Sequence, residues 1–221
     1  MTALEAVLFD MDGTLCDTEP SWIAAEFAMA NRYGATWTRA DAIRLIGQNL
    51  PTAGAVIKER MGLDLTPDAV VDELLDGVIE ALLTDGPVWR PGAVELLVAC
   101  NAGGVPTALV TMSYARFVDA VLKDLPAGWF DIVVTGDQVA RGKPDPAPYL
   151  VAADLLDVDP TGCVAIEDSI PGTASAEAAG CTVVVVPHHV AIPASPSRVV
   201  VRSLVDIGVE DLEAFLAAAR D

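Results

Sequence analysis

The sequence predicts an α/β fold in which a doubly wound, mostly parallel sheet is interrupted by an inserted all-helical segment. Apolar runs without polar alternation, typical of strands buried on both faces, occupy residues 4–9, 106–110, 132–134, 163–166 and 182–186. From the second run onward these runs alternate with helical patterns, as expected of a Rossmann-like core. Between residues 18 and 86 only helical patterns occur.

The helices of the alternating region carry boundary signals. Pro91 suits a first helical turn, Asp145 can cap a helix that begins at Pro146, and Gly180 is typical of a position just past a helix end. Residues 187–198 are expected to form a loop. The expected helices cover residues 91–100, 113–122, 146–156, 170–179 and 211–219.

The inserted segment predicts a helical cap. Its expected helices cover residues 19–33, 38–46, 52–61 and 66–83. A block of this size is near the lower limit for an independent core. We therefore expect a catalytic core at 1–17 and 88–221 and a cap at 18–87, hinged on the linkers near 16–17 and 87–90.

Composition narrows the classes of partner. The chain has 221 residues, 52% of them hydrophobic, and a net charge of −19 with a pI near 4.2. Nucleic acid and anionic membranes both favour a basic surface, so neither is expected as a partner. A local pocket can still bind a small phosphorylated molecule, because salt screens the global field beyond about 8 Å.

Location is predicted from the N-terminus and the cysteines. Residues 1–10 lack a basic and then apolar signal-peptide pattern, and the apolar run at 182–186 is too short to span a bilayer. The four cysteines are scattered, which favours buried, reduced thiols over a metal cluster. We expect a cytoplasmic protein.

Polar residues directly follow several of the apolar runs. These positions are the carboxyl ends of the expected strands, which is where ligands bind in open parallel sheets. Asp10 and Asp12 flank Met11 and precede Gly13, which permits a turn. Asp10 can act as a nucleophile that forms an aspartyl-phosphate, and Asp12 as the acid and base. The alternative is a solvated acidic turn.

A second acidic pair, Glu167 and Asp168, ends another run. Together with Asp10 it would form a hard oxygen site suited to Mg²⁺. The alternative is that Asp168 or Ser169 caps the helix that follows.

Two further positions suit phosphate. Thr111, with the backbone N–H groups of Met112 and Ser113, would hold phosphate oxygens at a helix start, and Lys143 would neutralise the transferring group. Plain capping and a solvated loop lysine are the alternatives. Because all these signals fall in order at successive strand ends, we favour the catalytic interpretation.

The motifs resemble those of the haloacid-dehalogenase-like superfamily over nearly the whole chain. Residues 10–15 (DMDGTL) look like its first motif, 110–111 (VT) its second, 142–144 (GKP) its third and 166–169 (IEDS) its fourth. The inserted helices resemble the helical-cap subgroup, which includes sugar, polyol and phosphoglycolate phosphatases and beta-phosphoglucomutase.

The resemblance implies a phosphoric monoester hydrolase with Mg²⁺ as cofactor and a small phosphorylated metabolite as substrate. Asp10 and Asp12 would be catalytic, and the metal ligands would be Asp10, Asp12 (through its backbone carbonyl), Glu167 and Asp168. Phosphate contacts are expected from Met11, Asp12, Thr111, Met112 and Lys143.

The cap is expected to determine the substrate, with contacts from Glu19, Trp22, Gln48 and Asn49. Two features typical of beta-phosphoglucomutases are missing: Trp22 stands in place of a histidine, and residues 47–50 (GQNL) lack an arginine. A mutase, for which Arg44 or Lys58 would have to anchor a second phosphate, and a non-catalytic phosphate binder stay open as alternatives. His188 and His189 are expected to be surface residues, and the protein a monomer or a homodimer.

Overall fold

The computed structural model describes residues 4–46, 48–123 and 125–219. Its centre is a parallel sheet of six strands in the order β3-β2-β1-β4-β5-β6. The predicted α/β class is confirmed. The strands are β1 (Ala6–Phe9), β2 (Thr107–Val110), β3 (Ile132–Val134), β4 (Cys163–Glu167), β5 (Thr182–Val185) and β6 (Arg198–Val200).

Helices cover both faces of the sheet, and β1 shows how the faces divide. Val7 and Phe9 pack into one core cluster, whereas Ala6 and Leu8 pack into a second cluster that contains Tyr149. Helices α7 (Ala147–Leu156) and α8 (Ile170–Ala179) supply the second cluster. The first receives α5 (Ala93–Gly103), α6 (Ala115–Leu122) and α9 (Val209–Ala218).

The sixth strand is absent from the sequence-based prediction. Residues 187–198 were expected to form a loop, but β6 begins at Arg198 and pairs in parallel with β5, with Val199 opposite Val184. It is three residues long, at the sheet edge and partly exposed. β3 is equally short, but Thr135 and Gly136 mark its end, whereas residues 201–203 (VRS) after β6 give no such signal.

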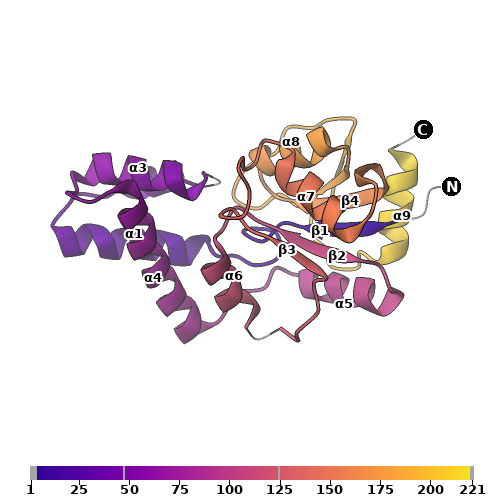
Figure 1. The fold of residues 1–221 in the computed structure, drawn as a ribbon, viewed down its shortest axis with the longest axis horizontal. Helices are drawn as coiled ribbons and strands as arrows, with labels where there is room; N and C mark the ends of the chain where they lie inside the picture. The colour runs from indigo at the N-terminus through magenta and orange to yellow at the C-terminus, as the bar shows by residue number, and fades with distance from the viewer. Residues whose placement is uncertain (1–3, 47, 124, 220–221) are drawn as a thin grey trace.

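The inserted segment forms four helices that stand apart from the sheet, at the end where α6 lies (Figure 1). They are α1 (Glu19–Tyr33), α2 (Arg39–Ile43), α3 (Leu50–Met61) and α4 (Pro67–Asp85). Side-chain caps from Thr38, Asn49 and Thr66 begin the last three. The second helix is shorter than the predicted range 38–46: it ends at Ile43, and turns follow.

Two linkers join the helical segment to the sheet and pair with each other. The backbone N–H of Asp17 donates to the carbonyl of Val88 at 2.8 Å, and Cys16 forms an antiparallel bridge with Trp89. Trp22 of α1 also meets Phe117 of α6 edge to face, at 5.3 Å between ring centres. The cap boundaries themselves stay a prediction.

Two expectations about composition can be compared with the fold. All four cysteines are buried free thiols, as predicted. None of the helices in the described part of the chain is long and apolar enough to cross a membrane.

Candidate active site

The predicted site residues gather at the carboxyl ends of the central strands. Asp10 follows β1, Thr111 follows β2, and Glu167 and Asp168 lie at the end of β4. Lys143 arrives from the loop between β3 and α7 and is hydrogen-bonded to Asp10. Residues spread over most of the sequence are therefore brought together by the parallel topology.

Lys143 is the buried cation of the site. Its Nζ donates to Oδ1 of Asp10 at 2.6 Å, to Oε1 of Glu167 at 2.6 Å and to the carbonyl of Val110 at 2.8 Å. Burial alone would lower the pKa of Lys143, but the two carboxylates outweigh burial and raise it above the ordinary value. The ammonium group is therefore charged and fixed in direction.

Glu167 is fully buried behind Lys143, and both of its carboxylate oxygens are occupied. Oε1 accepts from Lys143 and from the Tyr149 hydroxyl at 2.7 Å. Oε2 accepts from the backbone N–H groups of Asp168 and Ser169 and from the Ser169 hydroxyl. A metal contact by Glu167 would compete with these hydrogen bonds, so the geometry favours a role in holding Lys143.

Asp10 and Asp168 line the pocket, whereas Glu167 beside them does not. Burial, followed by the nearby Glu167 charge, raises the pKa of Asp10 to about 7 despite Lys143. Burial and the Asp10 charge raise the pKa of Asp168 to about 9. Gly13 has a φ of 91° and lies against Asp168, where an added Cβ would come within 2.0 Å of Oδ2.

This pair fits the predicted magnesium ion. Asp10 and Asp168 each offer a carboxylate oxygen, and these two oxygens lie within 4.8 Å of each other and of an oxygen of Glu167. Like charges packed this closely raise one another's pKa, and a divalent cation relieves that repulsion. An all-oxygen donor set is the one that Mg²⁺ prefers.

Asp12 is oriented by three hydroxyl groups from two segments of the chain. Thr18 donates to Oδ1 at 2.5 Å, while Thr111 and Ser113 donate to Oδ2 at 3.1 and 2.8 Å. Thr18 and the Ser113 hydroxyl are absent from the predicted site. The only signal for Ser113 was its place two residues after Thr111 in the same loop.

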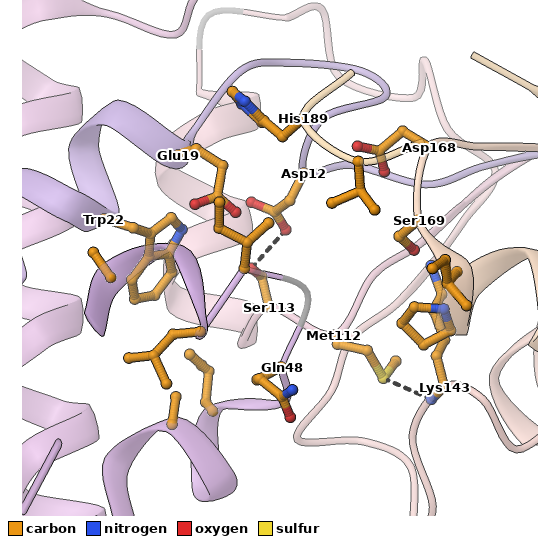
Figure 2. Close-up of a pocket in the computed structure, with 18 of the residues that line it drawn as sticks. Asp12, Glu19, Trp22, Gln48, Met112, Ser113, Lys143, Asp168, Ser169 and His189 are labelled. Carbon is orange, nitrogen blue, oxygen red and sulfur yellow. Dashed lines mark hydrogen bonds between the residues drawn. The ribbon is translucent and has the colours of Figure 1, made fainter. Parts of the chain in front are cut away.

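A pocket of about 230 Å³ opens between these residues and the helical segment. Figure 2 shows Glu19 and Trp22 on one side of it and Lys143, Asp168 and Ser169 on the other. The remaining labelled residues, Asp12, Gln48, Met112, Ser113 and His189, also line it. Three of the four predicted substrate contacts, Glu19, Trp22 and Gln48, therefore face the pocket.

Several predicted contacts lie elsewhere. The Asn49 side chain accepts from the Thr52 N–H and caps α3, so it is not among the pocket-lining residues that the structure describes. The Met11 side chain packs in the core, and Thr111 is buried with its hydroxyl turned to Asp12. Only the backbone of Met11 is then left to meet phosphate.

Two glutamates, half-buried Glu19 and buried Glu26, give the cap side of the pocket an acidic edge. Burial and the nearby Asp12 charge raise the pKa of Glu19 to about 8. Burial raises the pKa of Glu26 to about 7, although the Trp37 ring N–H donates to it at 2.9 Å. Apart from Gln48, the rest of this side is apolar, with contributions from Leu45, Leu50, Ile57 and Leu74.

Known proteins with similar sequences include phosphatases, and known structures with a similar fold include CbbY. Hexitol phosphatase A of Escherichia coli is 36% identical, with 81% of each chain covered. The bifunctional riboflavin kinase/FMN phosphatase of Arabidopsis thaliana is 31% identical over 92% of this chain, which spans only 54% of that protein. CbbY of Rhodobacter sphaeroides, solved with xylulose-1,5-bisphosphate, superposes with a TM-score of 0.85 at 27% identity and covers 95% of this chain and 99% of its own.

A sequence model of the haloacid dehalogenase-like hydrolases matches residues 4–180, most of the chain. The expected enzyme class, a phosphoric monoester hydrolase, is supported by the named relatives. The predicted fold, the hydrolase class and the resemblance drawn from the four motifs are in agreement. The chain therefore belongs to the haloacid dehalogenase-like hydrolase family.

Proposed function

We propose that this hydrolase is a Mg²⁺-dependent phosphatase that removes the phosphoryl group from a small sugar, polyol or short-acid monophosphate through an aspartyl-phosphate intermediate. The observation that carries the proposal is the placement of Asp10. Its carboxylate lies at the pocket floor, with one oxygen fixed 2.6 Å from the Lys143 ammonium group. Its other oxygen is left to attack phosphorus.

In the first step Oδ2 of Asp10 attacks phosphorus, and the bond from phosphorus to the ester oxygen breaks. Asp12, held by Thr18 and Ser113, gives its proton to the departing oxygen. In the second step Asp12 takes a proton from water, and the water oxygen attacks the same phosphorus. The bond between phosphorus and Asp10 then breaks, which restores the carboxylate and releases inorganic phosphate.

Charge stabilisation in this reaction has two sources. Lys143 meets the negative charge of the transferring phosphoryl group from the floor of the site. Asp10 and Asp168 would hold the Mg²⁺ ion, together with the Asp12 backbone carbonyl implied by the family resemblance. When bound, the ion would supply positive charge that stabilises the negative charge of the transferring phosphoryl group.

The pocket supports a substrate with one phosphate group. Lys143 is the only lysine or arginine among its described lining residues. Lys58, one of the two cations considered as anchors for a second phosphate, donates instead to the carbonyls of Leu63 and Leu65. Arg44, the other, is exposed and is not among those lining residues. A phosphomutase or a bisphosphate-specific enzyme would need such an anchor.

Among these substrate classes the pocket lining favours a sugar or polyol over a short acid, because it suits an uncharged leaving group with hydroxyl groups on one side. Glu19 and Gln48 offer hydrogen-bonding groups, whereas Trp22 and the leucine-rich wall offer apolar contact. A sugar or polyol presents both kinds of surface. This also agrees with hexitol phosphatase A being among the relatives.

The test is phosphate release from a panel of sugar, polyol and glycolate monophosphates and a matching sugar bisphosphate, with and without Mg²⁺. We expect release that requires Mg²⁺, favours monophosphates and is abolished in Asp10→Asn. Asp119→Asn, which changes an exposed aspartate of α6, is the matched control and should keep full activity. Undiminished release by Asp10→Asn would refute the assignment of the nucleophile.

A further inference from the structure

A second group of possible metal ligands lies outside the proposed magnesium site. Asp17 belongs to the first linker, and His188 and His189 belong to the loop after β5. Nε2 of His188 lies 3.1 Å from Oδ2 of Asp17, and Nε2 of His189 lies 3.2 Å from Oδ1. One ligand atom from each of the three residues lies within 4.8 Å of the others.

The contacts of His188 leave a donor atom unused. Its Nε2 is buried, and although it is close to Asp17 it lacks a hydrogen-bond partner of acceptable geometry in the described structure. Such an unsatisfied buried nitrogen is uncommon and calls for an explanation. A metal ion bound by this nitrogen would supply the missing interaction.

The rings are arranged for joint ligation. His188 and His189 lie with ring centres 3.7 Å apart, and both Nε2 atoms face the one carboxylate. Burial, helped by the charge of Arg90, lowers the pKa of His188 below its ordinary value, which favours the neutral imidazole that binds metals. The Asp17 carboxylate offsets the positive charge of Arg90.

We propose that Asp17, His188 and His189 form a binding site for a zinc-type transition-metal ion, distinct from the magnesium site. Two imidazole nitrogens and one carboxylate oxygen are a donor set that Zn²⁺ accepts, with water in the fourth position. Mg²⁺ prefers oxygen ligands and competes poorly for imidazole. The donor chemistry therefore separates the two sites.

A metal ion bound here would join the paired linkers, through Asp17, to the loop after β5 that carries His188 and His189. Asp17 is hydrogen-bonded to Val88 of the other linker, and His189 lines the pocket beside Glu19. If the helical segment moves on these linkers during turnover, the bound ion opposes that motion. Zinc inhibition of phosphate release, a consequence that rests on the proposed function, is therefore expected.

Binding is tested on tag-free, full-length protein with Mg²⁺ in excess. Because the chain contains only two histidines, ¹⁵N NMR of the imidazole rings reports on the site directly without any variant. One equivalent of Zn²⁺ should shift the Nε2 resonances of both His188 and His189. Unchanged resonances would overturn the proposal.

Variants test the ligands one by one by calorimetric titration with Zn²⁺. His188→Gln and Asp17→Asn should each weaken binding at least tenfold, whereas Asp85→Asn, at an exposed position in the last turn of α4, should bind as the wild type does. Equal affinity in all four proteins would refute the site. Thermal unfolding of each variant identifies any that has not folded.

Inhibition of phosphate release by Zn²⁺ is measured in a separate assay. Zn²⁺ should inhibit the Mg²⁺-supported activity of the wild type, and His188→Gln should need at least tenfold more Zn²⁺ for the same fractional loss. Equal inhibition of both proteins would refute the link to turnover. A protein that binds Zn²⁺ through the histidines but releases no phosphate from any substrate would instead refute the proposed function.

Discussion

Gly172→Ala is expected to damage the active site from a helix that contributes no side chain to the chemistry. Gly172 lies in the first turn of α8, where its backbone N–H donates to the Ser169 hydroxyl. An added Cβ would lie 1.9 Å from Oε1 of Glu167 and 2.0 Å from its carboxyl carbon. The glutamate must therefore move.

The cost follows from what holds the Glu167 carboxylate. Moving it breaks at least the hydrogen bonds that Oε1 accepts from Lys143 and Tyr149. Hydrogen bonds to charged groups contribute about 1.5–3 kcal/mol each, and alanine regains about 1 kcal/mol over glycine within a helix. The free energy of unfolding should fall by about 2–5 kcal/mol, a large part of the roughly 5–15 kcal/mol typical of a folded protein.

Urea unfolding and phosphate release measure the two consequences. Gly103→Ala in the last turn of α5 is the matched control, because the nearest atoms to its added Cβ are 3.9 Å away. The control should be as stable as the wild type or slightly more so. Gly172→Ala should also lose at least tenfold in kcat, because Lys143 loses a fixed partner. If both variants are equally stable and active, the reasoning about Glu167 is wrong.

Three further predictions use the same measurements. Lys143→Met should abolish phosphate release and destabilise the fold by about 3–5 kcal/mol, because it leaves buried carboxylates unpaired. Ser113→Ala should lower kcat by about tenfold through Asp12 and lower stability by about 1.5–3 kcal/mol, because the buried hydroxyl donates to the Asp12 carboxylate; an unchanged kcat would show that the hydroxyl is dispensable. The pKa of Glu26 rises from 4.5 to about 7 on folding, so the folded state binds this proton more tightly, and the resulting stability, present at low pH, is lost as pH rises through 7. Glu26→Gln should therefore match the wild type near pH 4 and exceed it by up to about 3 kcal/mol at pH 8 in urea unfolding, whereas the exposed control Glu80→Gln should show no such divergence.

The strand ends could be predicted because the sequence signal there is local. An apolar run that stops at Asp10 or Glu167 gives both the strand and the place where it ends. Parallel topology then brings those ends together without any knowledge of side-chain contacts. The same logic does not reach β6, because residues 201–203 after it carry no such signal and its pairing with β5 is a tertiary contact.

Residues that act by tertiary contact were not predictable in this way. Tyr149 looks like an ordinary apolar position of α7, and its hydroxyl acquires a role only when α7 packs beside Glu167. His188 and His189 were expected at the surface, and His189 is indeed exposed while His188 is half-buried. What the sequence could not predict is that both side chains meet Asp17 from a distant part of the chain. Asn49 shows the converse, because an asparagine two residues before Pro51 is also a helix-capping signal.

The central claim, that Asp10 carries the phosphoryl group, is tested most directly by trapping the intermediate. The enzyme is quenched in acid during turnover of its best monophosphate and is then digested. The masses of the peptides are measured by mass spectrometry. We predict a single acid-stable phosphoryl group on Asp10. It should accumulate in Asp12→Asn supplied with acetyl phosphate, because acetate leaves without a proton from Asp12 and only the second step then lacks its base. A phosphoryl group on another residue would contradict the account. So would quenched enzyme that carries no phosphoryl group although Asp12→Asn still cleaves the substrate.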